Sequence, residues 1–257
     1  MERMSAMHAP SVSASMKTLV VLEAALTNER FTDIVDAAAL PKSTVHRILA
    51  TLVEEGFVAG DADSGYRAGG RLLAIAGRVL SAADSTTLAR PISEKLVADV
   101  DCTVHFGVHS GDEMVYLIRS DSSKPYRMRS RVGLGIPLHT SGMGKTVLAH
   151  WDPADVERYA ERTGLPARTG ATLVNLPDLL SSLADVRERG YALDLGENEV
   201  GTVCVSAPVF DHTRRATHGL SISSIAVEHP GSTIEALAPE VMAAAREISR
   251  LLGYPGA

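Results

Sequence analysis

The chain has 257 residues, which exceeds the usual size of one compact domain, so we expect two unequal domains. No stretch approaches the roughly 20 apolar residues of a membrane span, and the start lacks an export signal, which predicts a soluble cytoplasmic protein with no membrane partner. The formal net charge of -6 argues against a surface coated with positive charge for nucleic acid, although it permits a small basic patch.

The N-terminal part of the sequence contains three segments with helical spacing. Residues 1–14 are expected to be disordered, and helices are predicted over 15–27 and 32–38. The third helix should include Pro41 in its first turn and should end at Gly56. Its apolar positions share one face and are Val45, Ile48, Leu49, Leu52 and Val53.

A short hairpin and a further helix complete this region. The polar segment 60–65 separates Phe57 and Val58 from Tyr66 and Arg67, which predicts two short strands joined by a turn. The order of three helices and a hairpin predicts a winged helix-turn-helix over 15–69, followed by a linker helix over 70–87.

The outer face of the third predicted helix carries short polar and basic side chains near its amino end. Such groups reach base edges in the major groove, while flanking groups bind phosphates. An amphipathic helix with a merely solvated face is the alternative, and the hairpin and exit helix favour DNA binding. Because basic residues are few, we expect specificity to require a dimer that reads two half-sites. The predicted DNA contacts are Lys42, Ser43, Thr44, His46, Arg47 and Arg67.

Beyond residue 86 the pattern changes to a mixture of strands and helices. Segments 102–109 and 113–120 predict a second hairpin, and further strands are expected over 203–210 and 218–226. This mixture predicts an α+β domain over 88–257, built on an antiparallel sheet with one face available to a ligand or partner. Helices are predicted over 89–100, 144–151, 152–163, 177–189 and 233–252.

The segment PLHTSGMGKT, residues 137–146, contains a Gly-Lys-Thr triplet. The phosphate-loop spacing would require glycine where His139 stands, so we exclude nucleotide hydrolysis. Two interpretations remain. One is a plain capped helix packed on the sheet. The other is a helix start, capped by Thr140 or Ser141, where the backbone N–H groups of Gly142 and Met143 bind a small carboxylate.

Acidic residues near Cys204 raise the question of a thiol nucleophile. A reactive thiol needs a base or a positive field, and the sequence has no histidine between Trp151 and Phe210. Cys204 is therefore expected to be a small strand residue that lines either core or cavity. Cys102 and Cys204 lie about a hundred residues apart, which is not the spacing of a metal-binding or redox cysteine pair. His105 and His109 would share a strand face, but we assign no metal and no cofactor.

Taken together, the motifs resemble the IclR family of bacterial transcription regulators over nearly the whole chain. LPKSTVHRILATLVEEGFV, residues 40–58, is similar to the family's helix-turn-helix. HTSGMGKTVLA, residues 139–149, resembles its SGxGKAxLA segment, with Thr146 where alanine is usual. The family's signature spacing is matched by Gly190, Asp194, Glu197, Cys204, Val205, Ser206, Val209, Phe210 and Asp211.

The resemblance implies a winged helix for DNA, a linker helix that dimerises, and a GAF-like domain that binds a small effector, with dimers often pairing as tetramers. In family members whose effectors are small carboxylates, certain positions hold the ligand. The corresponding residues here are Met128, Ile136, Gly142, Met143, Asp194, Thr202, Cys204, Ser221 and Ser223.

These observations predict a DNA-binding regulator, a repressor, whose C-terminal domain binds a small organic acid. Its expected partners are double-stranded operator DNA, the effector and further copies of the chain in a homodimer or tetramer. We do not expect an enzyme. The alternatives are a thiol-dependent hydrolase that uses Cys204, and a ligand-sensing module that acts through protein partners.

Overall fold

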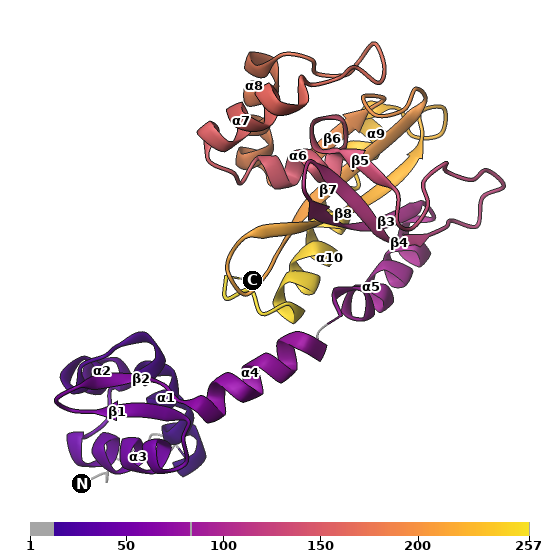
Figure 1. The fold of residues 1–257 in the computed structure, drawn as a ribbon. Coiled ribbons are helices and arrows are strands. Elements are labelled where there is room, and N and C mark those ends of the chain that lie inside the picture. Colours follow the sequence, from indigo (N-terminus) through magenta and orange to yellow (C-terminus); the bar gives the residue numbers. More distant parts are fainter. Residues whose placement is uncertain (1–12, 83, 257) are drawn as a thin grey trace, which may run out of the picture. The chain divides into compact units, whose positions relative to one another are not determined.

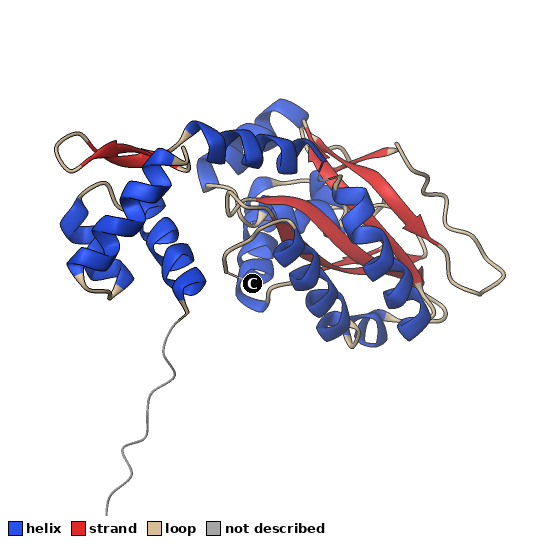
Figure 2. Cartoon of the chain, turned by 90° about the horizontal axis from the view of Figure 1, so that it is seen from below, coloured by secondary structure: helices blue, strands red, loops and turns tan. Residues whose placement is uncertain are grey.

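The computed structural model describes residues 13–82 and 84–256, and the chain divides after Ala82 into two compact units (Figures 1 and 2). Most of the start that the sequence predicts to be disordered, residues 1–12, lies outside the described residues. Within the described ranges, no helix has both the length and the apolar character needed to cross a bilayer.

The first unit is built from helices around a small apolar core, with an antiparallel hairpin attached. The backbone N–H of Tyr66 donates to the carbonyl of Glu29, which joins the hairpin to the turn between the first two helices. Ala39 ends the second helix in the left-handed conformation, and Pro41 caps the third helix instead of lying within its first turn. The elements are α1 (Ala14–Thr27), α2 (Phe31–Ala38), α3 (Lys42–Glu54), β1 (Val58–Asp61), β2 (Gly65–Ala68) and α4 (Gly70–Ala82).

The predicted apolar face of α3 is confirmed. Four of its five positions are buried against α1 and α2, and Val53 is half-buried. The opposite face is exposed, so the short polar residues near the start of α3 lie in solvent. This unit therefore has the helix, helix, helix, hairpin order of a winged helix-turn-helix.

The second unit is a six-stranded antiparallel sheet with helices on both faces. Helices α5 (Ser85–Val100) and α10 (Ala238–Leu251) cover one face, and α6 (Gly142–Leu148) lies on the other with α7 (Pro153–Thr163) and α8 (Leu176–Arg189). In sheet order the strands are β5 (Gly135–Pro137), β4 (Glu113–Ser120), β3 (Thr103–Ser110), β8 (Ala216–Ile225), β7 (Thr202–Phe210) and β6 (Ala192–Leu195).

The two faces of this sheet differ because side chains alternate along a strand. On β7, Val203 and Val205 point into the apolar core under α5 and α10, while Cys204 and Ser206 point to the α6 side. On β8, Leu220 lies in the same core, while Ser221 and Ser223 point to the α6 side. The sheet therefore presents a polar strip toward α6.

Several element boundaries differ from the prediction. The expected helix over 233–252 is two helices, α9 (Gly231–Glu235) and α10, because Pro239 occupies the first turn of the second. Helix α5 begins at Ser85, where the Asp84 side chain accepts from the N–H of Thr86, so the predicted linker range 70–87 includes its first turn. The short strands β5 and β6 were not predicted.

Glycines let α6 approach its neighbours closely. A Cβ atom on Gly219 of β8 would stand 2.8 Å from the Cβ of Met143, and one on Gly107 of β3 would stand 3.4 Å from the Cε of Met143. A Cβ on Gly144 would stand 2.2 Å from the carbonyl oxygen of Leu138. The position of α6 therefore depends on the absence of side chains at Gly219 and Gly144.

We predict that Gly144→Ala lowers the free energy of unfolding by about 1–3 kcal/mol, because the added methyl group overlaps backbone that has no room to move. Gly170→Ala is the matched control: a Cβ there meets nothing within 4 Å, and its effect should stay within about 0.5 kcal/mol. Urea unfolding of the two variants checks the difference. A Gly144→Ala protein as stable as the wild type would contradict the close contact.

Candidate functional site

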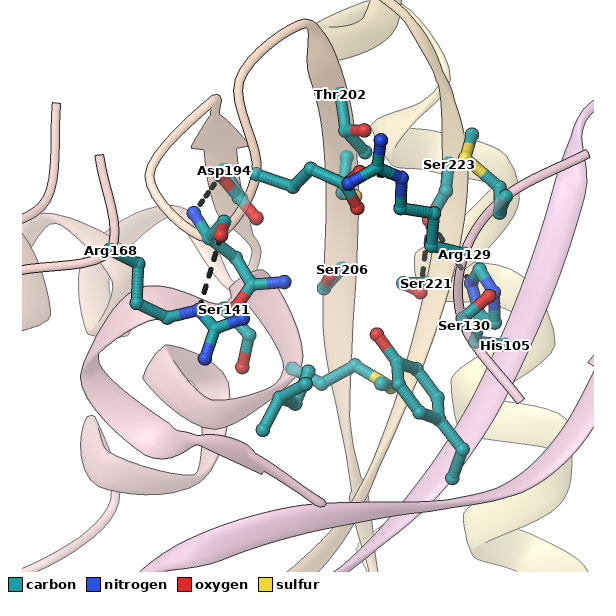
Figure 3. Close-up of a pocket in the computed structure, with 18 of the residues that line it drawn as sticks. His105, Arg129, Ser130, Ser141, Arg168, Asp194, Thr202, Ser206, Ser221 and Ser223 are labelled. Atoms are coloured by element: carbon teal, nitrogen blue, oxygen red, sulfur yellow. Dashed lines mark hydrogen bonds and ion pairs between the residues drawn. The ribbon is translucent and has the colours of Figure 1, made fainter. Parts of the chain in front are cut away.

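A cavity of about 500 Å³ lies on the polar side of the sheet, between the strands and the start of α6 (Figure 3). All of the positions that the sequence assigned to an effector site line this one cavity. The predicted residues found in its lining are Met128, Ile136, Gly142, Met143, Asp194, Thr202, Cys204, Ser221 and Ser223.

The floor of the cavity is made of short polar side chains from four neighbouring strands. Cys204 of β7 lies opposite Asp194 of β6 on one side and Ser223 of β8 on the other. Ser221 of β8 lies between Ser206 of β7 and His105 of β3. Strand register therefore brings together residues that lie more than a hundred positions apart in the sequence.

His105 extends this floor to the loop between β4 and β5. Its Nδ1 lies 3.2 Å from the Ser223 Oγ, and its Nε2 lies 2.7 Å from the Ser130 Oγ. Burial, with a smaller contribution from the nearby Arg119, lowers the pKa of His105 to about 4. The imidazole is therefore neutral at pH 7, and it acts as a hydrogen-bonding group in the wall.

Ser206 has an unpaired hydroxyl. It is fully buried, and its Oγ has no hydrogen-bond partner within the described part of the chain. A Cβ on Gly142 would stand 2.4 Å from that Oγ, so any larger residue there would require the hydroxyl to rotate. The Ser141 hydroxyl caps α6 by accepting from the N–H of Gly144 at 3.1 Å, whereas Thr140 donates to Pro137 and Asn198 instead. Of the two caps that the sequence allowed, the structure uses Ser141.

Asp194 is buried and closes the turn that follows β6. Its Oδ1 accepts from the N–H of Glu197 at 2.7 Å and from that of Asn198 at 3.4 Å. Burial, together with the negative charge of Glu197, raises the pKa of Asp194 to about 7. Glu197 is in turn paired with the buried Lys145 of α6. At neutral pH the Asp194 carboxyl is thus partly protonated and can both donate and accept.

Cys204 lies in this floor as a thiol. Burial and the adjacent Asp194 both raise its pKa, so the nucleophilic thiolate is disfavoured. The residue lines the cavity, which decides between the two positions, core or cavity, that the sequence left open.

The rim of the cavity comes from loops in which the sequence predicted no ligand contact. Thr169 donates to the carbonyl of Gly196 at 2.7 Å, and Arg168 donates through Nε to the carbonyl of Asn198 at 3.2 Å. On the other side Arg129 pairs with Glu199 at 3.3 Å. Lining residues missing from the prediction are His105, Tyr116, Arg129, Ser130, Leu134, Ser141, Arg168, Thr169, Asn198, Glu199, Val200 and Ser206.

Three of these residues carried a signal in the sequence: Ser206 continues the strand alternation of Thr202 and Cys204, Ser141 precedes Gly142 as a possible cap, and His105 lies on a predicted strand. The suspected histidine pair has separate surroundings: His109 contacts the carbonyl of Gly111 and packs edge-on against Trp151. Within the described ranges, no group of three His, Cys, Asp or Glu side chains could hold a metal ion.

The predicted DNA contacts form a second set, in the first unit. Lys42, Ser43, His46 and Arg47 are exposed on α3, and Thr44 is half-buried between them. Arg67 is exposed on β2. These side chains have the position on a third helix and wing that a winged helix-turn-helix uses to read DNA.

A winged helix-turn-helix, together with a ligand-sized cavity in a separate α+β unit, defines a ligand-responsive DNA-binding regulator. Residues 14–62 match the family model for the IclR helix-turn-helix domain. Residues 77–250 match the model for the C-terminal part of the bacterial transcriptional regulator IclR. The chain belongs to the IclR family of bacterial transcriptional regulators.

Individual relatives agree with this assignment. The chain is 31% identical over 246 residues to the HTH-type transcriptional regulator XynR of Escherichia coli, an alignment that covers 95% of this chain and 98% of XynR. The crystal structure of the Agobacterium tumefaciens repressor BlcR aligns with a TM-score of 0.72 at 26% identity, covering 96% of this chain and 99% of BlcR. An IclR homolog from Microbacterium hydrocarbonoxydans, crystallised with 4-hydroxybenzoate, aligns with a TM-score of 0.60 at 25% identity, covering 93% and 99% of the two chains.

The raised pKa of Asp194 predicts a pH-dependent stability. The folded state keeps the Asp194 proton up to about pH 7, whereas the unfolded chain loses it near the ordinary value of 3.8, so this residue's contribution to stability falls as pH rises between the two. Asp194→Asn cannot ionise and retains an oxygen acceptor. Relative to wild type, the variant should therefore gain a few kcal/mol in free energy of unfolding from pH 4 to pH 7.

Urea unfolding at several pH values measures this difference. Glu197 also has a raised pKa and remains in both proteins, so its contribution largely cancels in the comparison. Parallel curves for the variant and the wild type would show that the Asp194 carboxyl ionises normally in the folded protein.

Proposed function

We propose that the protein is a repressor that binds operator DNA as a homodimer or tetramer, and that a small organic acid in the cavity changes its affinity for DNA. In this proposal residues 15–69 read DNA, residues 70–87 link and dimerise, and residues 88–257 bind the effector. The observation that carries it is the single cavity that gathers all nine predicted effector residues. The repressor name of the structural relative BlcR supports the direction of control.

The DNA-binding half of the proposal rests on α3 and the hairpin. Lys42, Ser43, Thr44, His46 and Arg47 would contact bases and phosphates from the major groove, and Arg67 would add a contact from the wing. So few cations give one unit modest affinity, because phosphate contacts supply much of the binding free energy. Two units that read paired half-sites would supply the rest.

The effector half rests on the chemistry of the cavity. The N–H groups of Gly142 and Met143 are in the first turn of α6, where they have no acceptor within the helix, so they can donate to an oxygen of the ligand. Met128, Ile136 and Thr202 would form the less polar wall. The 4-hydroxybenzoate bound to the homolog from Microbacterium hydrocarbonoxydans supports an acid as the ligand class.

A thiol hydrolase is the weaker alternative. The raised pKa of Cys204 and the hydrogen bonding of His105 to serines, with no bond to the thiol, both oppose a nucleophilic role. We expect a Cys204→Ala protein to keep binding operator DNA and to keep responding to effector. Gel shifts with and without ligand measure both, and loss of the DNA response together with an esterase or amidase activity in the wild type would favour the enzyme.

We predict that Arg47→Ala weakens binding to the specific operator by roughly 5- to 150-fold, the range expected for one lost base contact. Because Arg47 is exposed on α3, the thermal unfolding midpoint of the Arg47→Ala protein should match that of the wild type. Arg90→Ala removes the same charge from an exposed position on α5 and should leave DNA affinity unchanged.

Gel shifts with the DNA upstream of the protein's own gene, at several salt concentrations, test the DNA-binding part of the proposal. The specific complex should weaken as salt rises, because bound phosphates release counterions. Absence of a specific complex for the wild-type protein would favour the other alternative, a sensor that acts through protein partners.

A further inference from the structure

Positive charge is distributed unevenly around the cavity. Among the described lining residues, the two arginines, Arg129 and Arg168, both stand at the rim. His105 reaches the floor but is neutral at pH 7. Lys145 of α6 does not line the cavity, and it is buried and paired with Glu197. A ligand anion would therefore meet a side-chain cation at the rim and not on the floor.

The two rim arginines are not equivalent. Arg129 pairs with Glu199 at 3.3 Å, so its charge is already offset within the rim. Arg168 uses its Nε to donate to the carbonyl of Asn198, and its side chain extends from its loop toward the cavity in Figure 3. Among the described residues the Nη groups of Arg168 have no hydrogen-bond partner, so they can bind a carboxylate in the two-pronged geometry that guanidinium groups favour.

The loop that carries Arg168 is held in place on both sides. Thr169 and Thr172 each donate to a backbone carbonyl of the turn after β6, at 2.7 Å. The Nε2 of His139 lies 3.2 Å from the carbonyl of Pro166, and because that carbonyl only accepts, Nε2 carries the proton and Nδ1 accepts from the Tyr159 hydroxyl at 2.8 Å. A loop fixed by these bonds lets Arg168 bind an anion without first ordering its backbone.

The floor has the opposite chemistry. Ser206 offers a buried hydroxyl with no partner in the described chain, and Ser221 and Ser223 lie beside it. Each hydroxyl can donate and accept, as can a ligand hydroxyl. A ligand carboxylate on the floor would instead lie near Asp194, whose own negative charge would repel it when ionised. The serine side of the floor thus fits ligand hydroxyls, and the N–H groups of Gly142 and Met143 can donate to a hydroxyl oxygen there as well.

We propose that the effector is a polyhydroxylated monocarboxylic acid of the sugar-acid type, with its hydroxyls on the serine floor and its carboxylate at Arg168. Arg168 is then the residue that selects acids over neutral compounds of the same shape. This inference rests on the proposed function, because it names the ligand class of the same cavity.

The test uses matched ligand pairs. Five- and six-carbon aldonates covering the common epimers are titrated calorimetrically into the full-length protein beside their neutral aldonamides, which differ only at the acid group. Hexanoate and 4-hydroxybenzoate represent acids with few or no hydroxyls. We expect at least one aldonate to bind the wild-type protein roughly 10- to 100-fold more tightly than its amide, the preference expected of a charge-assisted hydrogen bond.

Arg168→Gln should reduce this acid preference to about twofold or less, and Arg168→Lys should retain part of it because the charge remains. Arg158→Gln is the matched control: it removes an exposed arginine from α7 that does not line the cavity, and the acid preference should persist. Ser206→Ala should weaken acid and amide by the same factor, because it changes the floor alone. Thermal midpoints verify that all variants are folded.

Other results would overturn the inference. If hexanoate or 4-hydroxybenzoate binds and alters operator affinity while no aldonate binds, the ligand class is wrong and the proposed function stands. If Arg168→Gln keeps the full preference for acid over amide, the carboxylate lies on the floor. If no acid of any class changes the affinity for operator DNA, the proposed function fails together with the inference.

Discussion

The contact between α6 and the sheet brings the start of the helix against the polar strand residues of the cavity. Met143 packs over Gly107 and Gly219 of adjacent strands, and a Cβ atom on Gly219 would come within 2.8 Å of the Cβ of Met143. That approach places Gly142 against Ser206 and lets Lys145 reach Glu197 in the turn after β6. Because the same turn is closed by Asp194, the helix, the strip of polar strand residues and the rim loops form one connected arrangement.

This arrangement leaves polar groups buried without full hydrogen bonding, which is costly in a folded protein. The Ser206 hydroxyl lacks a partner among the residues that the structure describes, and Asp194 is buried where ionisation is disfavoured. A ligand that supplies hydrogen bonds to these groups would recover that free energy on binding. The same strands use their other face for an apolar core under α5 and α10, which stabilises the sheet on the side opposite the cavity.

Parts of this structure could be predicted from local sequence. The i, i+3, i+4 spacing on α3 and the alternation of valine with small polar residues on β7 follow from helix and strand geometry. The nine effector positions came from the family resemblance, and the structure gathers them in one cavity. Arg168 and Arg129 could not be predicted, because loop contacts made by residues such as Thr169 determine which loops fold over the cavity. Strands of three or four residues, such as β5 and β6, are too short to show a period.

The negative net charge also proved uninformative about DNA, since most of the proposed DNA contacts lie together on one exposed helix face. The central claim is that occupancy of the cavity and DNA binding are coupled, and such coupling must be reciprocal. The most direct test measures the affinity of the effector for the protein alone and for its operator complex. The account predicts that DNA lowers effector affinity by the same factor by which effector lowers DNA affinity. Equal effector affinity with and without operator would contradict it.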